Sequence, residues 1–338
     1  MSRMMDKTLT RRLLTVTVLV LAFALLSLLL PVLLLVALGV DLYRYAKDRT
    51  PAMAARIVAF GWAYLFGEAL AVLALAAVLL FGKARSLSAT YRLQNVWAAW
   101  NYNAFRSIFN VRFEVEGEDA AVPAPLVILA RHASLIDSLL PIMFVGRAHR
   151  MRLRYVLKQE LLADPALDIA GNRLPNHFID RRSKDFDLEL ASLRELASDL
   201  GADEGVVIFP EGTRYSERKR AKIAARHEGR AGVISALSRS YRRVLPPKPS
   251  GTLALLAATK ADVLVLAHRG LEGFARVADI WKGGLVGSRI SVGMWRVPRS
   301  AVPSGRAEQT EWLYKTWADV DTWITSRELT IGEPAVSR

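Results

Sequence analysis

The chain has 338 residues, contains no cysteine and carries a formal net charge of +14 at pH 7. The absence of cysteine excludes disulfides, thiolate nucleophiles and cysteine-ligated zinc sites. Hydrophobic residues make up 52% of the sequence, which predicts that part of the chain lies in lipid. The first 100 residues hold 11 basic and 4 acidic side chains around apolar runs, and the sequence has no nucleic-acid-binding signature. The charge therefore favours an anionic membrane surface as partner over nucleic acid.

Two long apolar runs occupy the N-terminal segment. Residues 13–40 carry no charge, and residues 57–82 carry only Glu68. Because about 20 apolar residues are enough to cross a bilayer, the runs predict a transmembrane or membrane-embedded helical hairpin. We assign residues 1–92 to this hairpin, with a polar linker over residues 41–56 and a kink at Pro31, and residues 93–338 to a second domain. The first run is too long for the apolar part of a cleaved signal peptide.

Two features near the hairpin each allow two interpretations. Glu68 is either a functional intramembrane carboxylate or a group that pairs with a neighbouring helix. Apolar residues at three-to-four spacing over residues 93–108 predict an amphipathic helix, including Trp97 and Trp100. This helix either places its aromatic rings among lipid headgroups or belongs to the core of the following domain.

From residue 111 onward, short β-rich runs alternate with helical patterns. This alternation predicts an α/β domain with a sheet covered by helices. The helical period over residues 186–200 predicts a helix that ends at Gly201 as a C-cap. The predicted strands are residues 111–117, 125–130, 153–158, 177–180, 205–210, 262–268 and 289–297.

The stretch Leu126–Pro141, "LVILARHASLIDSLLP", places His132 after a buried strand and Asp137 five residues later. Open α/β sheets form their ligand crevices at the C-terminal ends of strands, so His132 is a candidate general base that Asp137 would orient. The alternative is that Ser134 and Asp137 form a capping box and only satisfy the backbone of a helix start. The pattern alone leaves both interpretations open.

Two further clusters suggest anion binding. The first is "FPEGTR", residues 209–214, where a glycine turn follows a strand and Arg214 offers a guanidinium suited to phosphate. The second is "FIDRR", residues 178–182, where Arg181 and Arg182 precede a helix start. In the alternative interpretation, Arg214 is a surface charge and the two arginines pair with Asp185 or Asp187.

Together, His132-x4-Asp137 and Phe-Pro-Glu-Gly-Thr-Arg resemble the glycerophospholipid acyltransferases, the lysophosphatidic acid acyltransferase family. "LKQELLADP", "FIDR" and "VLPPKPSGTLALL" are similar to further blocks of that family, and the C-terminal region resembles its lysocardiolipin and microsomal branch. Three positions differ from the usual pattern. Arg131 replaces an asparagine, Pro175 replaces a glycine, and "VLVLAHRG" replaces a Val-Pro-Val block.

The resemblance implies an acyltransferase-type mixed sheet and transfer of a fatty acyl group to 1-acylglycerol-3-phosphate, giving phosphatidic acid. The donor would be the thioester of acyl-CoA or acyl carrier protein, with no other cofactor and no metal. His132 would act as general base and Asp137 would orient it. The implied substrate-binding residues are Glu211, Gly212, Thr213, Arg214, Arg181, Phe178 and Lys158.

The resemblance leaves several alternatives open. The acceptor could instead be lysocardiolipin or lysophosphatidylinositol, and a non-catalytic lipid-binding scaffold or a hydrolase is a further possibility, although no Gly-x-Ser-x-Gly elbow is present. Ser134 or Ser138 remains a possible nucleophile. We expect an integral membrane protein, in the cell (inner) membrane with its catalytic domain on the cytoplasmic side. The other histidines, including His268, are expected to be surface or structural residues.

Overall fold

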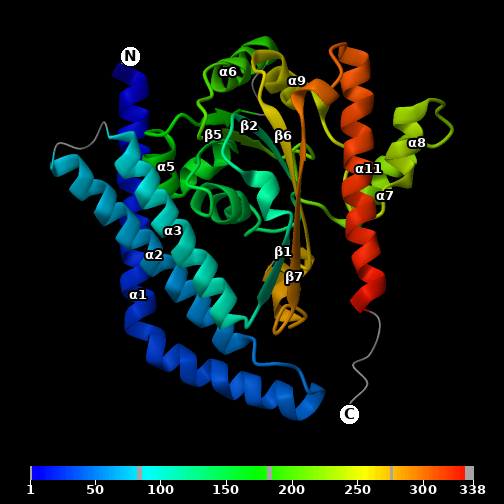
Figure 1. Cartoon of the computed structure of the whole chain (residues 1–338). Coiled ribbons are helices and arrows are strands. Elements are labelled where there is room, and N and C mark those ends of the chain that lie inside the picture. Colours follow the sequence, from blue (N-terminus) through cyan, green and yellow to red (C-terminus); the bar gives the residue numbers. More distant parts are fainter. Residues whose placement is uncertain (1, 82–85, 181–184, 275–276, 332–338) are drawn as a thin grey trace. The chain divides into compact units, whose positions relative to one another are not determined.

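The computed structural model describes residues 2–81, 86–180, 185–274 and 277–331 (Figure 1). The chain divides into two compact units. The first unit contains residues 1–112, 154–184 and 277–288, and the second contains residues 113–153, 185–276 and 289–338. The predicted division into residues 1–92 and 93–338 stays a prediction.

Three long helices form most of the first unit. They are α1 (Ser2–Asp48), α2 (Ala54–Leu80) and α3 (Leu87–Ile108), and α2 packs against both of the others (Figure 1). The first predicted run is therefore helical throughout and the second is helical to Leu80, and both helices are long and apolar enough to cross a membrane. Helix α1 is continuous across Pro31, and Figure 1 shows that it bends along its length.

The linker between α1 and α2 is shorter than the sequence predicts, because α1 continues to Asp48. The buried carboxylate of Asp41 accounts for this difference. Its Oδ1 accepts hydrogen bonds from the backbone N–H groups of Met53 (2.9 Å) and Ala54 (2.8 Å), and its Oδ2 accepts one from Ala55. A helical Asp41 thus caps the start of α2, which has no capping side chain of its own.

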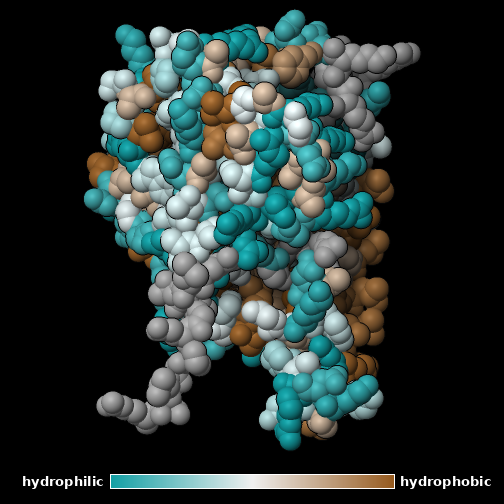
Figure 2. Space-filling view, turned by 90° about the vertical axis from the view of Figure 1, so that its right-hand side faces the viewer, coloured by the Kyte–Doolittle hydropathy of each residue, from teal (hydrophilic) through white to brown (hydrophobic). Residues whose placement is uncertain are grey.

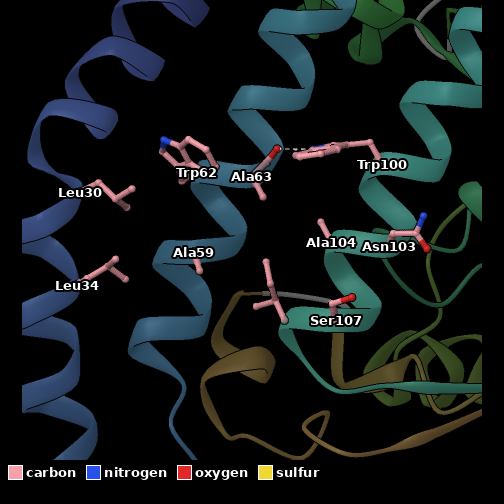
Figure 3. A pocket seen from close by; sticks show the side chains of 10 residues that line it. Leu30, Leu34, Ala59, Trp62, Ala63, Trp100, Asn103, Ala104 and Ser107 are labelled. Carbon is pink, nitrogen blue, oxygen red and sulfur yellow. Dashed lines mark hydrogen bonds between the residues drawn. The ribbon is translucent and has the colours of Figure 1, made fainter.

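Helix α3 packs against α2 through its tryptophans. The Trp97 indole N–H donates to Glu68 (2.6 Å), and that of Trp100 donates to the carbonyl of Ala63 (2.8 Å). Of the two interpretations of Glu68, pairing with a neighbouring helix describes the structure. The tryptophans pack on α2 within the first unit, so α3 does not belong to the core of the second unit. An apolar crevice of about 460 Å³ lies between α1, α2 and α3 (Figure 3). It is lined by Leu30, Leu34, Ala59, Trp62, Ala63, Trp100, Asn103, Ala104, Ser107 and Ile108.

The remainder of the first unit is a small α/β part. The later residues of β3 (Arg152–Lys158) pair in parallel with β4 (His177–Ile179). Between these strands lie the 3-10 turn η3 (Gln159–Ala163) and α5 (Pro165–Gly171), and α10 (Val277–Trp281) comes later in the chain. The buried Asp168 of α5 accepts hydrogen bonds from Arg11 and Arg12 of α1. Charged contacts thus join α1 to this part.

The second unit contains a mixed sheet in the strand order β1-β7-β6-β2-β5, with the start of β3 beside β5. Strand β2 is parallel to β5 and β6, whereas β7 is antiparallel to β6. All seven predicted strands are present, and the mixed sheet is confirmed. The bounds are β1 Arg112–Glu116, β2 Leu126–Ala130, β5 Glu204–Ile208, β6 Asp262–Arg269 and β7 Arg289–Val297.

Helices cover this sheet (Figure 1). Strands β2 and β5 are buried at every residue, as expected for central strands of a covered parallel sheet. The helices are α6 (Phe186–Ser198), α7 (Glu217–Arg226), α8 (Val233–Ser240), α9 (Pro249–Ala258) and α11 (Arg306–Ile331), with short turns η1 (Glu118–Ala121), α4 (Leu139–Pro141), η2 (Ile142–Arg147), η4 (Glu272–Phe274) and η5 (Arg299–Ala301). Figure 2 shows that the side bearing α7, α8 and α11 is mainly hydrophilic.

The predicted end of α6 is wrong. The helix stops at Ser198 with Asp199 at its C-cap, and Gly201 does not adopt the left-handed conformation of a glycine cap. Instead, the Gly201 N–H donates to the Glu204 carboxylate (3.1 Å), so this glycine belongs to the turn into β5. At the other end, Asp185 caps the helix by accepting the Leu188 N–H (3.0 Å).

Candidate active site

The candidate site lies at the C-terminal ends of three adjacent parallel strands, β5, β2 and β6. His132 follows β2 by two residues, Glu211 follows β5 by three, and His268 is the penultimate residue of β6. Because the strands are parallel and in register, residues 79 and 136 positions after His132 reach the same edge of the sheet. This is the edge at which open α/β sheets bind their ligands.

His132 and Asp137 form a hydrogen-bonded pair, with 3.0 Å between Nδ1 and Oδ1. The other carboxylate oxygen accepts the backbone N–H groups of Ala133 (2.6 Å) and Ser134 (2.7 Å). Burial tends to raise the pKa of Asp137, but the hydrogen bond with His132 and the neighbouring His268 imidazole outweigh it and hold the pKa well below the ordinary range. An ionised Asp137 requires the hydrogen on Nδ1 of His132, which leaves Nε2 to accept a proton.

The hydrogen bonds of the Ser134–Asp137 pattern lie in a turn ahead of the helix start, because α4 begins at Leu139 with Ser138 at its N-cap. The Ser134 Oγ accepts the N–H of Ile136 (3.2 Å) and of Asp137 (3.1 Å), while Asp137 accepts the N–H of Ser134. This is the reciprocal arrangement of a capping box, and it fixes the carboxylate that binds the imidazole. Ser134 is fully buried and its oxygen accepts two hydrogen bonds, so it is poorly placed to act as a nucleophile.

The two main sequence blocks form a single site through the backbone of His132. Its N–H donates to Glu211 (3.2 Å), and its carbonyl accepts the N–H of Tyr215 (2.7 Å). The Phe209 ring packs on the imidazole, with 4.8 Å between the ring centres. The imidazole side chain remains 15% exposed, whereas the Asp137 side chain is buried. The ring is therefore held firmly and is still accessible.

Glu211 holds the histidine turn to a later segment of the chain. Its two carboxylate oxygens accept the N–H groups of His132 and Leu245 (3.0 Å). Burial raises the pKa of Glu211 to about 8, although the nearby Arg131 opposes the shift. Asp137 and Glu211 therefore differ in charge near neutral pH, since Asp137 is ionised and Glu211 is mainly protonated. Backbone groups already contact both oxygens of Glu211, so the predicted contact with substrate phosphate stays a prediction.

The Gly-Thr-Arg turn follows directly. Gly212 is left-handed (φ 66°), and a Cβ atom there would lie 3.2 Å from Lys248 Cδ. Thr213 Oγ1 and the Arg214 carbonyl both accept hydrogen bonds from Lys219 (2.9 and 2.8 Å), so α7 fixes the turn. The exposed Lys248 is a candidate anion contact that the sequence interpretation missed. The "VLPPKPSGTLALL" block that contains it was the available signal.

Arg131 is fully buried at the base of the site. Its guanidinium donates to Glu272 (2.6 Å) and to the carbonyls of His268 (2.8 Å) and Arg243 (2.7 Å). Burial would raise the pKa of Glu272, but the charge on Arg131 lowers it to about 2. The residue that replaces the usual asparagine therefore joins β2, β6 and the residue 243 segment and does not face a substrate.

The residue 242–245 segment receives further support from α11. Asp321 accepts the N–H groups of Arg242, Arg243 and Val244 at 2.5–3.1 Å. The next residue along, Leu245, donates to Glu211. The C-terminal helix thus helps to position the site, a role that no sequence motif indicated.

His268 also lies beside Asp137, with 3.4 Å between Nε2 and Oδ2, and it is fully buried.

Three predicted residues cannot be placed in this site. Phe178 of β4 and Lys158 of β3 belong to the first unit, and Arg181 lies outside the described residues, so their substrate contacts stay predictions. Within the described ranges, no group of three or more His, Cys, Asp or Glu side chains is arranged to hold a metal ion.

The sequence model of the family described as Acyltransferase matches residues 112–248. This part of the chain is similar to the acyltransferase family. The acyltransferase region includes the His132–Asp137 pair, the Glu-Gly-Thr-Arg turn and Lys248.

Two relatives illustrate the similarity. Over 209 residues the chain is 23% identical to 1-acyl-sn-glycerol-3-phosphate acyltransferase epsilon of Mus musculus, covering 56% of this chain and 54% of that protein. The chain thus spans about half the length of this curated relative. The crystal structure of the 1-acyl-sn-glycerophosphate (LPA) acyltransferase PlsC from Thermotoga maritima aligns with a TM-score of 0.43 and 16% identity, covering 77% of this chain and 96% of that one.

Proposed function

We propose that the protein transfers a fatty acyl group from a thioester to the free hydroxyl of 1-acylglycerol-3-phosphate, giving phosphatidic acid. The observation that carries this proposal is the His132–Asp137 pair, whose Nδ1–Oδ1 hydrogen bond leaves Nε2 as the proton acceptor on a partly exposed ring. The mouse protein to which the chain is similar is named for this acceptor. The donor in the proposal is acyl-CoA or acyl carrier protein.

The proposed reaction is a direct transfer. The substrate hydroxyl gives its proton to Nε2 of His132 as its oxygen attacks the thioester carbonyl carbon, and Asp137 stabilises the resulting imidazolium. The tetrahedral intermediate then expels the thiolate as the carbon–sulfur bond breaks, and the proton on His132 passes to the sulfur. An acyl-enzyme intermediate is not required. General-base assistance of this kind contributes roughly 10² to 10⁴ in rate.

The surroundings of the pair suit an anionic lipid acceptor. Arg214 lies in the turn that follows Glu211, and Lys248 packs beside Gly212. Because Glu211 is mainly protonated near neutral pH, its charge does not oppose an incoming phosphate. Leu135, next to the pair in sequence, is 51% exposed and offers an apolar contact to a lipid chain. We assign the phosphate to Arg214 and Lys248.

We also propose that α1 and α2 anchor the protein in a membrane, with the acyltransferase domain on the cytoplasmic side of the cell membrane. Large apolar side chains lie exposed along most of α1, and water is a poor environment for such a surface. Basic residues of the N-terminal segment, such as Arg44 and Lys47, would lie near anionic headgroups.

An acyl-transfer assay tests the proposal. It uses purified full-length protein in detergent, 1-acylglycerol-3-phosphate as acceptor, and either labelled acyl-CoA or acyl carrier protein loaded with a labelled acyl group as donor. We expect labelled phosphatidic acid from the wild type and near-background product from His132→Ala. A panel that includes lysocardiolipin and lysophosphatidylinositol identifies the acceptor. Preference for another lysolipid would replace the acceptor, release of free fatty acid without acceptor would indicate a hydrolase, and no product with any acceptor would favour a lipid-binding scaffold.

A further inference from the structure

His268 is a buried polar residue beside the proposed catalytic pair that the mechanism does not yet use. It lies near the end of β6, the strand beside β2, and its side chain is fully buried. Its Nε2 is 3.4 Å from Oδ2 of Asp137, the oxygen that does not contact His132. Neither ring nitrogen completes a hydrogen bond to another described residue. A buried imidazole with no other partner therefore lies against the carboxylate.

The direction of this contact follows from charge. An ionised carboxylate attracts a ring nitrogen that carries hydrogen and repels one that presents a lone pair, so the hydrogen belongs on Nε2. The distance of 3.4 Å is longer than an ordinary hydrogen bond, and catalytic contacts are often long before substrate binds. His132 approaches one oxygen of Asp137, and His268 approaches the other.

The surroundings fix His268 in this place. Arg131, following β2, donates to the His268 carbonyl, and it also pairs with Glu272 of η4. On the other side, His268 pairs in register with Val292 of β7. The charged or titratable groups around the Asp137–His268 contact are thus Arg131, His132, Glu211 and Glu272.

We propose that His268 is a positioning residue of the acyl-transfer site, which holds Asp137 between two imidazoles and limits the negative charge that Asp137 presents to His132. The proposal rests on the function proposed above. A donor on Oδ2 withdraws charge from the carboxylate, so the carboxylate stabilises the protonated form of His132 less strongly.

Removing the donor should therefore change the pH dependence of the reaction. In His268→Leu, Asp137 presents more negative charge to His132, and the acid limb of the kcat/KM profile should move to higher pH by about half a pH unit or more. In His268→Gln, the side-chain amide can place an N–H close to the position of Nε2. This variant should keep the acid limb within about 0.2 pH units of the wild type.

The experiment compares the kcat/KM profiles of the full-length wild type, His268→Leu and His268→Gln between about pH 5 and 9, with Tm measured for each protein. The inference is supported if the acid limb of the kcat/KM profile lies at higher pH in His268→Leu and not in His268→Gln. Unchanged limbs in both variants, even with lower kcat, would overturn it and leave His268 a packing residue. If His268→Leu does not fold, His268→Asn replaces it, since the shorter amide does not reach Asp137.

A second measurement separates this inference from the proposed function. The imidazole NMR signal of His132, assigned by its loss in His132→Ala, can be titrated without turnover. A higher midpoint in His268→Leu than in the wild type supports the coupling even for a protein that shows no acyl transfer, and equal midpoints would refute it. Absence of wild-type activity with every acceptor would overturn the proposed function alone.

Discussion

Replacing Asp137 by asparagine should inactivate the protein without unfolding it. In the structure, one carboxylate oxygen accepts two backbone N–H groups at 2.6 and 2.7 Å, and the other accepts Nδ1 of His132 at 3.0 Å. The amide oxygen of asparagine has to face the two backbone donors, because the reverse orientation would set N–H groups against N–H groups. The amide nitrogen then faces His132 and requires Nδ1 to be an acceptor, which moves the imidazole hydrogen to Nε2.

That tautomer cannot accept the hydroxyl proton at Nε2. The expected loss in kcat is the full general-base contribution, roughly 10² to 10⁴, equivalent to about 2.7–5.4 kcal/mol in activation free energy. The assay measures acyl transfer from labelled acyl-CoA to 1-acylglycerol-3-phosphate, with Tm as the folding control. If Asp137→Asn kept kcat within about threefold of the wild type while folded, our account of the tautomer would be refuted.

Three further predictions concern the residues around the pair. Lys248→Ala should raise KM for 1-acylglycerol-3-phosphate about tenfold with little change in kcat, because it removes a charged phosphate contact. The control is Lys260→Ala, which removes an exposed lysine just before the opposite end of β6 and should leave KM unchanged. Equal effects of the two substitutions on KM would refute Lys248 as a phosphate ligand. Arg131→Leu should lower the free energy of unfolding, measured for the protein in detergent, by about 3 kcal/mol, because the buried carbonyls of His268 and Arg243 lose their donor. A loss below about 1 kcal/mol would contradict the role of Arg131 as a buried donor. Burial raises the pKa of Glu211 from an ordinary 4.5 to about 8. Between these two pH values the folded state binds more protons than the unfolded state. The contribution of Glu211 to the free energy of unfolding should therefore fall by up to about 1.4 kcal/mol per pH unit as the pH rises through this window. Glu211→Gln should lack this component of the pH dependence of Tm, and identical slopes in both proteins would refute a neutral Glu211.

Buried polar groups carry much of the architecture of the site. Asp137, Glu211 and Asp321 each accept backbone N–H groups from a loop near the sheet edge. The loops at this edge have few regular backbone partners, so carboxylates supply the acceptors. A functional constellation held by such contacts is expected to be sensitive to substitutions that do not touch the substrate.

Local patterns were sufficient to predict much of this protein. The continuous apolar runs identified the buried strands, including β2 and β5, because a strand covered on both faces has no polar side. The His132–Asp137 pair was also predictable, since both residues lie on one turn and the chain folds back over five residues. The two N-terminal helices followed from their length and lack of charge.

Only the tertiary structure decided which distant residues complete the site. His268 was expected to be a surface or structural residue, and Lys248 and Asp321 were not predicted at all, yet all three lie next to residues of the predicted motifs or of the loops that support them. Arg131 was recognised as unusual, but its inward direction depends on Glu272 and on two carbonyls more than 100 residues away in sequence. Helix-capping patterns act over a few residues and are visible in the sequence, whereas the alignment of parallel strand ends depends on strand order and register. Short-range spacing does not encode that order, so it had to come from the folded sheet.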